Sequence, residues 1–274
     1  MARTIEFTKM EGLGNDYVYV DAMRFPIIED PQALAVWMGD RHTGIGSDGL
    51  ILIGGSSVAD FSMRIFNADG SEGLMCGNGA RCVGKYVYDK GLTDKKEITL
   101  ETASGVRTLS LETGADGKVS LVTVDMGSFE ARPLGLNIGN HFFDGMSVNV
   151  GNPHFVVFTD SVNSVAVYGK SIEHHALFPD RTNVEFATSL YPGLIKMKVW
   201  ERGSGMTMAC GTGACATAVA AVLKGIAPES CTVRSDGGDL EIRCDTVSRK
   251  VYMKGPANLV FEGTVTLPVD GEDK

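Results

Sequence analysis

The chain contains the same short segment twice, and both copies have the same internal spacing. The first copy consists of Met63–Asn67, Cys76–Ala80 and Lys90-Gly91. The second consists of Met197–Glu201, Cys210–Ala214 and Lys224-Gly225, each 134 positions after its counterpart. A weaker echo pairs Gly14-Asn15 with Gly151-Asn152. This repeat predicts two similar halves that each contribute one thiol to a single site. Two acid/base groups facing each other are what inversion of a stereocentre requires.

Composition and charge narrow the class of protein. The chain has 274 residues, of which 43% are apolar and 22% charged, as in a soluble globular protein of one large or two ordinary domains. The net charge of −9 disfavours nucleic acid and acidic membrane surfaces as partners. No apolar run is long enough to span a bilayer, and the N-terminal residues lack the apolar core of a signal peptide. Six cysteines in such a chain are interpreted as thiols, which predicts a cytoplasmic protein.

Local patterns predict a strand-rich chain with a few helices. Residues 61–65 and 195–199 alternate apolar and polar side chains, as half-buried strands do. Further short strands are predicted at residues 17–20, 50–53, 106–111, 119–124, 155–158, 231–235, 240–244 and 258–261. Asp30-Pro31 favours the start of a helix that runs to about Asp40, and the apolar segment Ala214–Leu223 predicts a helix buried by sheet. The helices after the repeated cysteines are predicted to end at Lys-Gly.

Each repeated cysteine lies in the order strand, loop, Cys-Gly-x-Gly, helix. Glycines let a ligand approach the backbone, and the free N–H groups of a helix N-terminus attract an anion. The same field lowers the pKa of a cysteine from about 8.5, so we expect a thiolate that can act as a base. Two such helix ends would hold a carboxylate, with a thiolate on one face of the adjacent carbon and a thiol on the other. Two buried structural cysteines are the simpler alternative, which the matched spacing makes less favourable.

Longer motifs surround both cysteines and extend over nearly the whole chain. The segment Asn67–Arg81 reads NADGSEGLMCGNGAR. The other segments are Lys9–Asp16, Arg41–Asp48, Glu101–Gly105, Gly151–His154, Arg181–Phe186, Glu201–Gly205 and Ala209–Ala214. In content and in order, these segments resemble the signature blocks of the diaminopimelate epimerase family, whose members use no pyridoxal phosphate.

The resemblance implies an α+β fold with two pseudo-symmetric lobes, each a barrel-like mixed β-sheet around a central helix. We expect the N-terminal lobe to span residues 1–126 and the C-terminal lobe 127–262, with the joint near residues 125–132. The C-terminal segment, about 263–274, is expected to pack back on the first lobe. The active site is expected in the cleft between the lobes.

The resemblance also implies the reaction, the interconversion of LL- and meso-diaminopimelate in the biosynthesis of lysine and peptidoglycan precursors. Cys76 and Cys210 are expected to be the catalytic acid and base, with His154 and Glu201 modulating their protonation. The expected substrate-binding residues are Asn15, Asn67, Gly77, Asn78, Asn152, Asn183, Glu201, Arg202, Gly211 and Thr212. No cofactor and no metal are expected. The expected partner is the small-molecule substrate, not nucleic acid or a membrane, and a homodimer is left open.

The chemistry explains why these residue types are needed. An amino-acid α-proton is very weakly acidic, and the sequence has no evident motif for a pyridoxal lysine that could stabilise the carbanion. Two helix N-termini aimed at the substrate carboxylate would stabilise the enolate-like transition state instead. Amide side chains and one Glu-Arg pair suit a second, zwitterionic amino-acid group. One position departs from the family pattern, because Gly49 stands where some members carry a glutamine that could contact substrate.

The remaining cysteines are predicted to be structural, and two alternative functions remain open. Cys82, Cys215, Cys231 and Cys244 are expected to pack in the core, and the His174-His175 dipeptide lacks the neighbours of a zinc site. A two-cysteine proline or hydroxyproline racemase would share the fold and mechanism, but Asn78 and Arg81 argue against it. A thiol redox protein or a binding module is the alternative of a different class.

Overall fold

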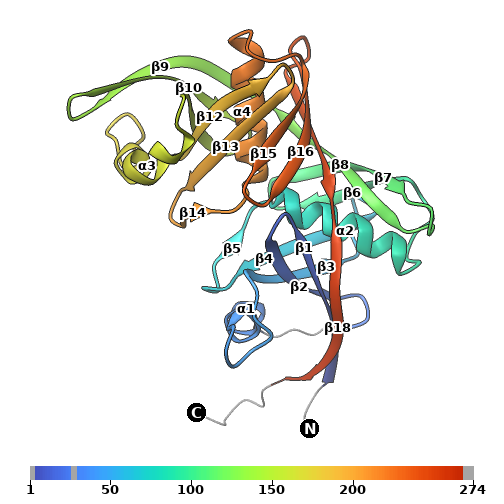
Figure 1. Ribbon diagram of the computed structural model, residues 1–274. Coiled ribbons are helices and arrows are strands. Elements are labelled where there is room, and N and C mark those ends of the chain that lie inside the picture. The colour runs from blue at the N-terminus through green and yellow to red at the C-terminus, as the bar shows by residue number, and fades with distance from the viewer. Residues whose placement is uncertain (1–3, 26–29, 268–274) are drawn as a thin grey trace. The chain divides into compact units, whose positions relative to one another are not determined.

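The computed structural model describes residues 4–25 and 30–267, and most of this backbone is β-strand. The predicted α+β fold class is confirmed (Figure 1). The chain divides into two compact units, one made of Met1–Val122 with Pro256–Lys274 and the other of Thr123–Gly255. From the sequence, the boundary between the two halves was expected a few residues later, near 125–132. The C-terminal segment that belongs with the first half was expected to begin at about residue 263.

The first unit is built on a mixed sheet. Its elements are β1 (Thr4–Gly12), β2 (Asn15–Asp21), α1 (Pro31–Gly39), β3 (Gly49–Gly54), β4 (Phe61–Asn67), β5 (Glu72–Gly73), α2 (Gly77–Asp89), β6 (Glu97–Thr102), β7 (Gly105–Thr113) and β18 (Asn258–Thr266). The pairing order is β18-β1-β2-β3-β4-β6-β7, with β5 paired to β4. The last strand thus completes the sheet beside the first one. Strand β8 (Val119–Ser128) crosses the boundary between the units.

The second unit contains the remaining elements. These are β9 (Glu130–Ile138), β10 (His141–Asn149), β11 (Pro153–Phe158), the 3₁₀ turn η1 (Val162–Ser164), α3 (Val165–Glu173), β12 (Asn183–Tyr191), β13 (Leu194–Glu201), β14 (Gly205–Thr207), α4 (Gly211–Leu223), β15 (Ser230–Ser235), β16 (Gly238–Asp245) and β17 (Lys250–Pro256). The pairing order is β9-β10-β11-β12-β13-β15-β16-β17, with β14 on β13.

The two units repeat the same sequence of strand directions. From β1 to β7 the successive pairs are antiparallel, parallel, antiparallel, parallel and antiparallel. The run from β10 to β16 has the same alternation. In each unit a two- or three-residue strand, β5 or β14, leads directly into the helix that follows the repeated cysteine. The duplication seen in the sequence is therefore also present in the order of elements.

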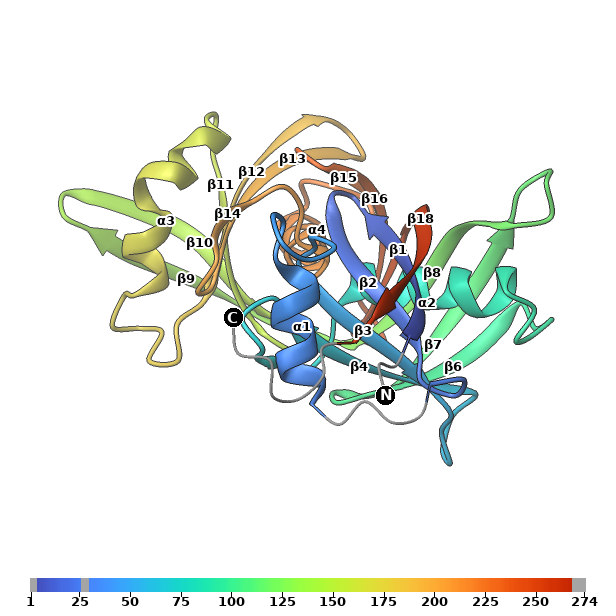
Figure 2. The same ribbon diagram turned by 90° about the horizontal axis from the view of Figure 1, so that it is seen from below.

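Helix α1 begins, and helices α2 and α4 end, where their residue types predict. Asp30 caps α1 by accepting a hydrogen bond from the Ala33 N–H, and Pro31 occupies the first helical position. Helices α2 and α4 end at Lys90 and Lys224, each followed by a glycine with φ of 71°. Helix α4 contacts β10–β13, β15 and β16, and Figure 2 views it almost along its axis with these strands curved around it.

Each unit has a hydrophobic cluster beneath a surface helix. In the first unit the cluster lies between α1 and the sheet and includes Leu34, Met38, Leu50 and Phe66. In the second unit it lies between α3 and strands β12 and β13. Helix α3 was not predicted, because it has no side-chain cap at Ser164 and starts with a β-branched residue. Packing against the sheet stabilises this helix despite its weak local sequence.

All the short strands predicted from alternation or apolar runs are confirmed as parts of longer strands. The sequence did not indicate the long hairpin β9-β10, whose outer residues are largely exposed. Among the described residues, no helix is long and apolar enough to cross a bilayer.

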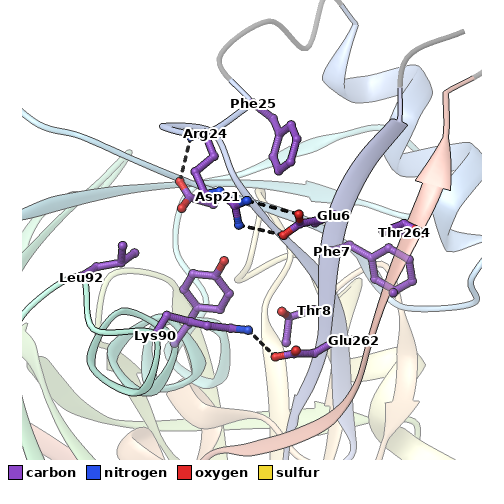
Figure 3. A pocket seen from close by; sticks show the side chains of 12 residues that line it. Glu6, Phe7, Thr8, Asp21, Arg24, Phe25, Lys90, Leu92, Glu262 and Thr264 are labelled. Carbon is purple, nitrogen blue, oxygen red and sulfur yellow. Dashed lines mark hydrogen bonds and ion pairs between the residues drawn. The ribbon is translucent and has the colours of Figure 1, made fainter.

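A cavity of about 380 Å³ lies in the first unit between β1, β18 and the end of α2 (Figure 3). Its two cations already have partners, since Arg24 pairs with Glu6 and Lys90 pairs with Glu262. None of the site residues predicted from the sequence lines this cavity.

Candidate active site

Cys76 is the N-cap residue of α2, at the point where the chain turns from β5 into the helix. Its backbone is extended, and its Sγ accepts a hydrogen bond from the Gly79 N–H at 3.3 Å. A Cβ at position 79 would lie 2.7 Å from Ile51 Cδ1, so only glycine fits this turn without displacing the core. The Cys-Gly-x-Gly spacing therefore directs a backbone donor at the sulfur.

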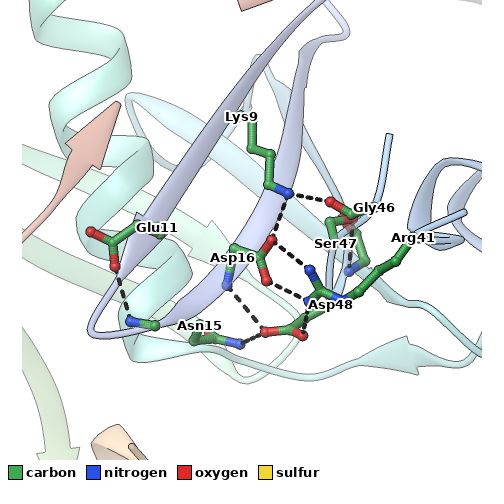
Figure 4. A network of polar contacts seen from close by, with 10 residues as sticks. Lys9, Glu11, Asn15, Asp16, Arg41, Gly46, Ser47 and Asp48 are labelled. Atoms are coloured by element: carbon green, nitrogen blue, oxygen red, sulfur yellow. Dashed lines mark hydrogen bonds and ion pairs between the residues drawn. The ribbon is translucent and has the colours of Figure 1, made fainter. Parts of the chain in front are cut away.

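Asn15 faces Cys76 from the β1-β2 hairpin. The hairpin turns through Leu13 and Gly14, both with positive φ, as a two-residue turn of this type requires. The Cys76 thiol donates to Asn15 Oδ1 at 3.3 Å. Asn15 Nδ2 in turn donates to Asp48 Oδ2 at 2.8 Å (Figure 4). Asp48 thereby fixes the amide with its oxygen toward the sulfur.

A network of four charged side chains holds Asp48 in place. Arg41 Nη2 bridges Asp48 at 3.0 Å and Asp16 at 2.8 Å, and Lys9 Nζ binds Asp16 at 2.7 Å (Figure 4). Partial burial of Asp16 opposes its ionisation, but the hydrogen bonds from Arg41 and Lys9 outweigh it and lower the pKa of this carboxyl. The Asp16 N–H also donates to Asp48 Oδ2 at 3.1 Å. Two anions and two cations thus balance each other behind Asn15.

Replacing Asp48 with alanine should reduce kcat/KM for the substrate by about 10- to 100-fold, because the Asn15 amide loses the charged acceptor that orients it. Asp40→Ala is the matched control. That carboxylate accepts from the N–H groups of His42 and Thr43 in the neighbouring loop. The control should retain wild-type kcat/KM. An Asp48→Ala enzyme with unchanged kcat/KM would show that Asn15 does not need this partner.

Two of the other predicted residues of the first unit lie at the same helix start, and the third, Asn67, lies on a neighbouring strand. Gly77 and Asn78 are buried in the first turn of α2. Asn78 Oδ1 has no hydrogen-bond partner among the described residues, which leaves a buried acceptor for a ligand. Asn67, at the end of β4, accepts from the Tyr17 hydroxyl at 3.4 Å and donates to Ser71 Oγ at 2.9 Å.

Cys210 repeats the geometry of Cys76 in the second unit. It caps α4, and its Sγ accepts from the Gly213 N–H at 3.3 Å. From the sequence, the helix N-terminus was expected to lower the pKa of each repeated cysteine. For Cys210 this prediction is wrong. Burial raises the pKa of the Cys210 thiol well above its ordinary value, and the carboxylates of Glu201 and Glu185 raise it further. The hydrogen bonds from Thr212 and from the Gly213 N–H lower this pKa but do not offset the burial and the two carboxylates.

Glu201 lies next to Cys210 at the end of β13. Burial raises the pKa of the Glu201 carboxyl, while hydrogen bonds with Thr207 and Cys210 partly offset that effect. A carboxylate with a raised pKa is a suitable acceptor for the proton of a neighbouring thiol. The structure therefore pairs the buried thiol with a base of the same unit.

A chain of hydrogen bonds runs from Glu185 through His154, Asn152 and Thr212 to Cys210. His154 Nε2 lies 3.0 Å from Asn152 Oδ1, and Asn152 Nδ2 donates to Thr212 Oγ1 at 3.3 Å. Thr212 Oγ1 is 3.4 Å from Cys210 Sγ. At the far end, His154 Nδ1 lies 2.7 Å from Glu185 Oε1. Three residues predicted from the sequence, His154, Asn152 and Thr212, are thus joined in one network.

The remaining predicted residues of the second unit adjoin one another. Asn183 Oδ1 accepts from the Arg202 N–H at 3.0 Å, and Asn183 Nδ2 donates to Pro153 O at 2.9 Å. The Arg202 side chain is exposed, and its Nη1 donates to Asp180 O at 3.1 Å. Gly211, like Gly77, is buried in the first turn of its helix.

Two residues of the site were not predicted, Asp48 and Glu185. Both lie inside segments that resemble family blocks, but nothing in their local pattern identifies them. Glu185 alternates with Val184 and Phe186 on β12, and all three are buried. The signal that could have identified Glu185 is its charge. A glutamate in a strand with buried residues on both sides needs a hydrogen-bond partner or an opposite charge.

The other four cysteines are buried in helices α2 and α4 or in strands β15 and β16, as predicted. Burial raises the pKa of Cys82 and Cys244 to about 12, so neither thiol ionises readily. In the part of the chain that the structure describes, no three His, Cys, Asp or Glu side chains form a group that could hold a metal ion.

The position that departs from the family pattern has a backbone that excludes a side chain. Gly49 has φ of 154°, and a Cβ there would lie 2.1 Å from Phe66 O. A glutamine at this position would require a different local backbone in β3.

Comparison with known proteins places the chain among epimerases. The family model described as diaminopimelate epimerase matches residues 7–131 and 146–260. Diaminopimelate epimerase of Bacteroides thetaiotaomicron is 55% identical over 269 residues, covering 96% of this chain and 98% of that protein. Among solved structures, a Bacillus anthracis phenazine biosynthesis protein of the PhzF family has a TM-score of 0.75 at 16% identity, covering 97% of this chain and 100% of that one. A hydroxyproline epimerase from Agrobacterium vitis has a TM-score of 0.71 at 16% identity, covering 98% and 94%. These two structures share the fold with this chain.

Proposed function

We propose, from the premise that this chain belongs to the diaminopimelate epimerase family, that it interconverts LL- and meso-diaminopimelate with Cys76 and Cys210 as its acid/base pair. The observation that carries the proposal is the matched geometry of the two cysteines. Each caps a helix, and each Sγ accepts from the second glycine N–H at 3.3 Å. Two equivalent thiols suit a reaction that removes a proton from one face of a carbon and returns it to the other.

The proposed reaction takes place with the substrate α-carbon between the two thiols. One cysteine, as thiolate, removes the α-proton, and the other, as thiol, donates its proton to the opposite face. The N–H groups at the starts of α2 and α4 would bind the α-carboxylate, whose negative charge increases as the carbanion forms. In the reverse direction the two cysteines exchange roles. Glu201, hydrogen-bonded to Cys210, would accept the thiol proton when Cys210 acts as base.

Recognition of the distal amino-acid group is assigned to Asn67, Asn183, Glu201 and Arg202. The Arg202 guanidinium is exposed and can bind a carboxylate in a bidentate manner, and amide groups can bind both the ammonium and the carboxylate. This set favours a substrate with a second zwitterionic centre over proline or hydroxyproline, which have none. The reaction would serve the biosynthesis of lysine and of peptidoglycan precursors.

The same proposal places the enzyme in a reducing compartment, the cytoplasm, because both cysteines must be reduced to act. Cys210 is a thiol in the structure and is not part of a disulfide. The substrate is the only partner that the site requires. A net charge of −9 is unfavourable for nucleic acid, and a homodimer is testable by sedimentation.

Incubation of the reduced protein with LL-diaminopimelate in D₂O tests the function. We expect one deuterium at the inverted α-carbon of the meso product and convergence on an equilibrium mixture from either isomer. A redox protein would instead leave the substrate unlabelled and would cycle its thiols through a disulfide. Absence of both inversion and label under reducing conditions would refute the proposed reaction, and turnover of hydroxyproline in its place would point to the rival racemase class.

A further inference from the structure

Glu185 is the most deeply buried carboxylate in the site, and it lies outside the reaction described above. Its side chain is fully inaccessible, as is that of His154. Oε1 lies 2.7 Å from His154 Nδ1, and Oε2 has no hydrogen-bond partner among the described residues. A Cβ at Gly213 would lie 2.8 Å from Oε1, so the carboxylate also contacts the start of α4. Burial of such a group destabilises the fold unless hydrogen bonds or an opposite charge compensate for it. A group of this kind that is retained in a site is therefore a candidate for a functional role.

Three polar groups surround the Glu185 carboxylate. His154 from β11, Glu201 from β13 and Cys210 at the start of α4 all face it. Of these three groups, His154 has a ring nitrogen at hydrogen-bond distance from the carboxylate, 2.7 Å from Glu185 Oε1. The geometry therefore pairs Glu185 with His154.

The hydrogen bonds beyond His154 all run in one direction. With Nδ1 donating to Glu185, the other ring nitrogen faces Asn152 Oδ1, an acceptor, at 3.0 Å, so it donates as well. The Asn152 amide must then present Nδ2 to Thr212 Oγ1. The Thr212 hydroxyl, which accepts this bond, directs its own hydrogen to Cys210 Sγ.

We propose that Glu185 is a positioning residue that, through His154, Asn152 and Thr212, directs a hydrogen bond onto Cys210 and so stabilises its thiolate. Sγ receives two donors in this arrangement, the Thr212 hydroxyl and the Gly213 N–H. The proposal rests on the assignment of Cys210 as an acid/base group. At Cys76 the neighbouring amide has the opposite orientation, since Asn15 presents its oxygen to that sulfur.

The Glu185→Gln variant removes the charge and keeps the shape of the side chain. Glutamine is a weaker acceptor than a carboxylate, so the bond from His154 Nδ1 no longer fixes the direction of the hydrogen-bond chain, and the Asn152 amide turns over. The Thr212 hydroxyl now donates to Asn152 instead of to Cys210. Loss of one hydrogen bond to a thiolate should slow alkylation of Cys210 by iodoacetamide about tenfold at neutral pH. The pH midpoint of this alkylation should move up by about one unit.

Mass spectrometry of digested protein measures alkylation of Cys210 and of Cys76 in the same sample. Cys76 should react at the wild-type rate, which makes it an internal control for folding. Glu173→Gln is the matched variant, because it removes another buried carboxylate of the same unit, one that binds Trp200 Nε1 and the Gly203 N–H. It should leave Cys210 alkylation unchanged. The readout needs no turnover, so it stands even if the proposed substrate is wrong.

A double-mutant cycle tests the route. Thr212→Val alone should slow Cys210 alkylation as Glu185→Gln does, and the double variant should be no slower than either single variant. Unchanged or faster Cys210 alkylation in Glu185→Gln would overturn the proposal, and so would additive effects in the double variant. If Glu185→Gln does not fold, Thr212→Val with wild-type Cys210 reactivity would be equally decisive against it.

Discussion

Alanine at Cys76 or at Cys210 is expected to lower epimerisation by at least about 10⁴-fold, the upper range for loss of one general acid or base. The loss should be this large because inversion needs a proton donor on one face and an acceptor on the other, and neither single variant retains both. The measurement is kcat for each variant in both directions, with the reduced protein.

Cys231→Ala and Cys244→Ala are the matched controls. Both cysteines are buried thiols on strands of the second unit, β15 and β16, and neither caps a helix. These variants should lose some stability and keep wild-type kcat. Serine at Cys76 or Cys210 should retain a small part of the proton exchange, since a hydroxyl remains in place. An alanine variant that still inverts its substrate at an appreciable rate would rule out the two-base assignment.

Lysine is expected to be turned over at least about 10³-fold less efficiently than diaminopimelate, because it leaves the distal binding groups without a carboxylate partner. A hydrogen bond to a charged group contributes about 1.5–3 kcal/mol, so loss of a bidentate pair of such bonds corresponds to roughly 10² to 10⁴ in kcat/KM. Arg202→Met should cause a similar loss on diaminopimelate. The quantity to compare is kcat/KM for both substrates with both enzymes.

Arg234→Met is the control for Arg202→Met, since Arg234 is exposed and pairs with Asp239 at 2.7 Å on the surface hairpin. It should leave kcat/KM unchanged. Alkylation of Cys76 and Cys210 in Arg202→Met should match the wild type, which would separate lost recognition from lost chemistry. Gly49 could weaken this selection, because the backbone there excludes the glutamine that in some family members could contact substrate. Comparable turnover of lysine and diaminopimelate by the wild-type enzyme would force the assigned substrate to be abandoned.

Local features of the fold could be predicted from sequence because they depend on neighbouring residues. Strand alternation in β4 and β13, the cap of α1 and the glycine ends of α2 and α4 are of this kind. Helix α3 could not be predicted, since its stability comes from packing against β12 and β13.

The electrostatics of the site depended on contacts between distant segments. The cysteine motif correctly indicated a backbone donor at each sulfur, but not the environment of Cys210. Its pKa is raised by burial, which the motif does not report, and by the carboxylates of Glu201, which was predicted to act on the cysteines, and of Glu185, which was not. Asp48 lies 33 residues from Asn15, and Glu185 lies 31 residues from His154. No local pattern reports such pairs.

The pairing of β18 with β1 sets the order in which a growing chain can complete its units. Every strand from β9 to β17 leaves the ribosome before β18, so the second unit can finish its ladder while the first still lacks an edge. At usual rates of synthesis, β1 waits on the order of 10 s or more for this partner. An unpaired edge can pair with other chains, and charged side chains are a common protection. Glu6, Lys9 and Glu11 on β1 would keep a nascent chain soluble during that interval.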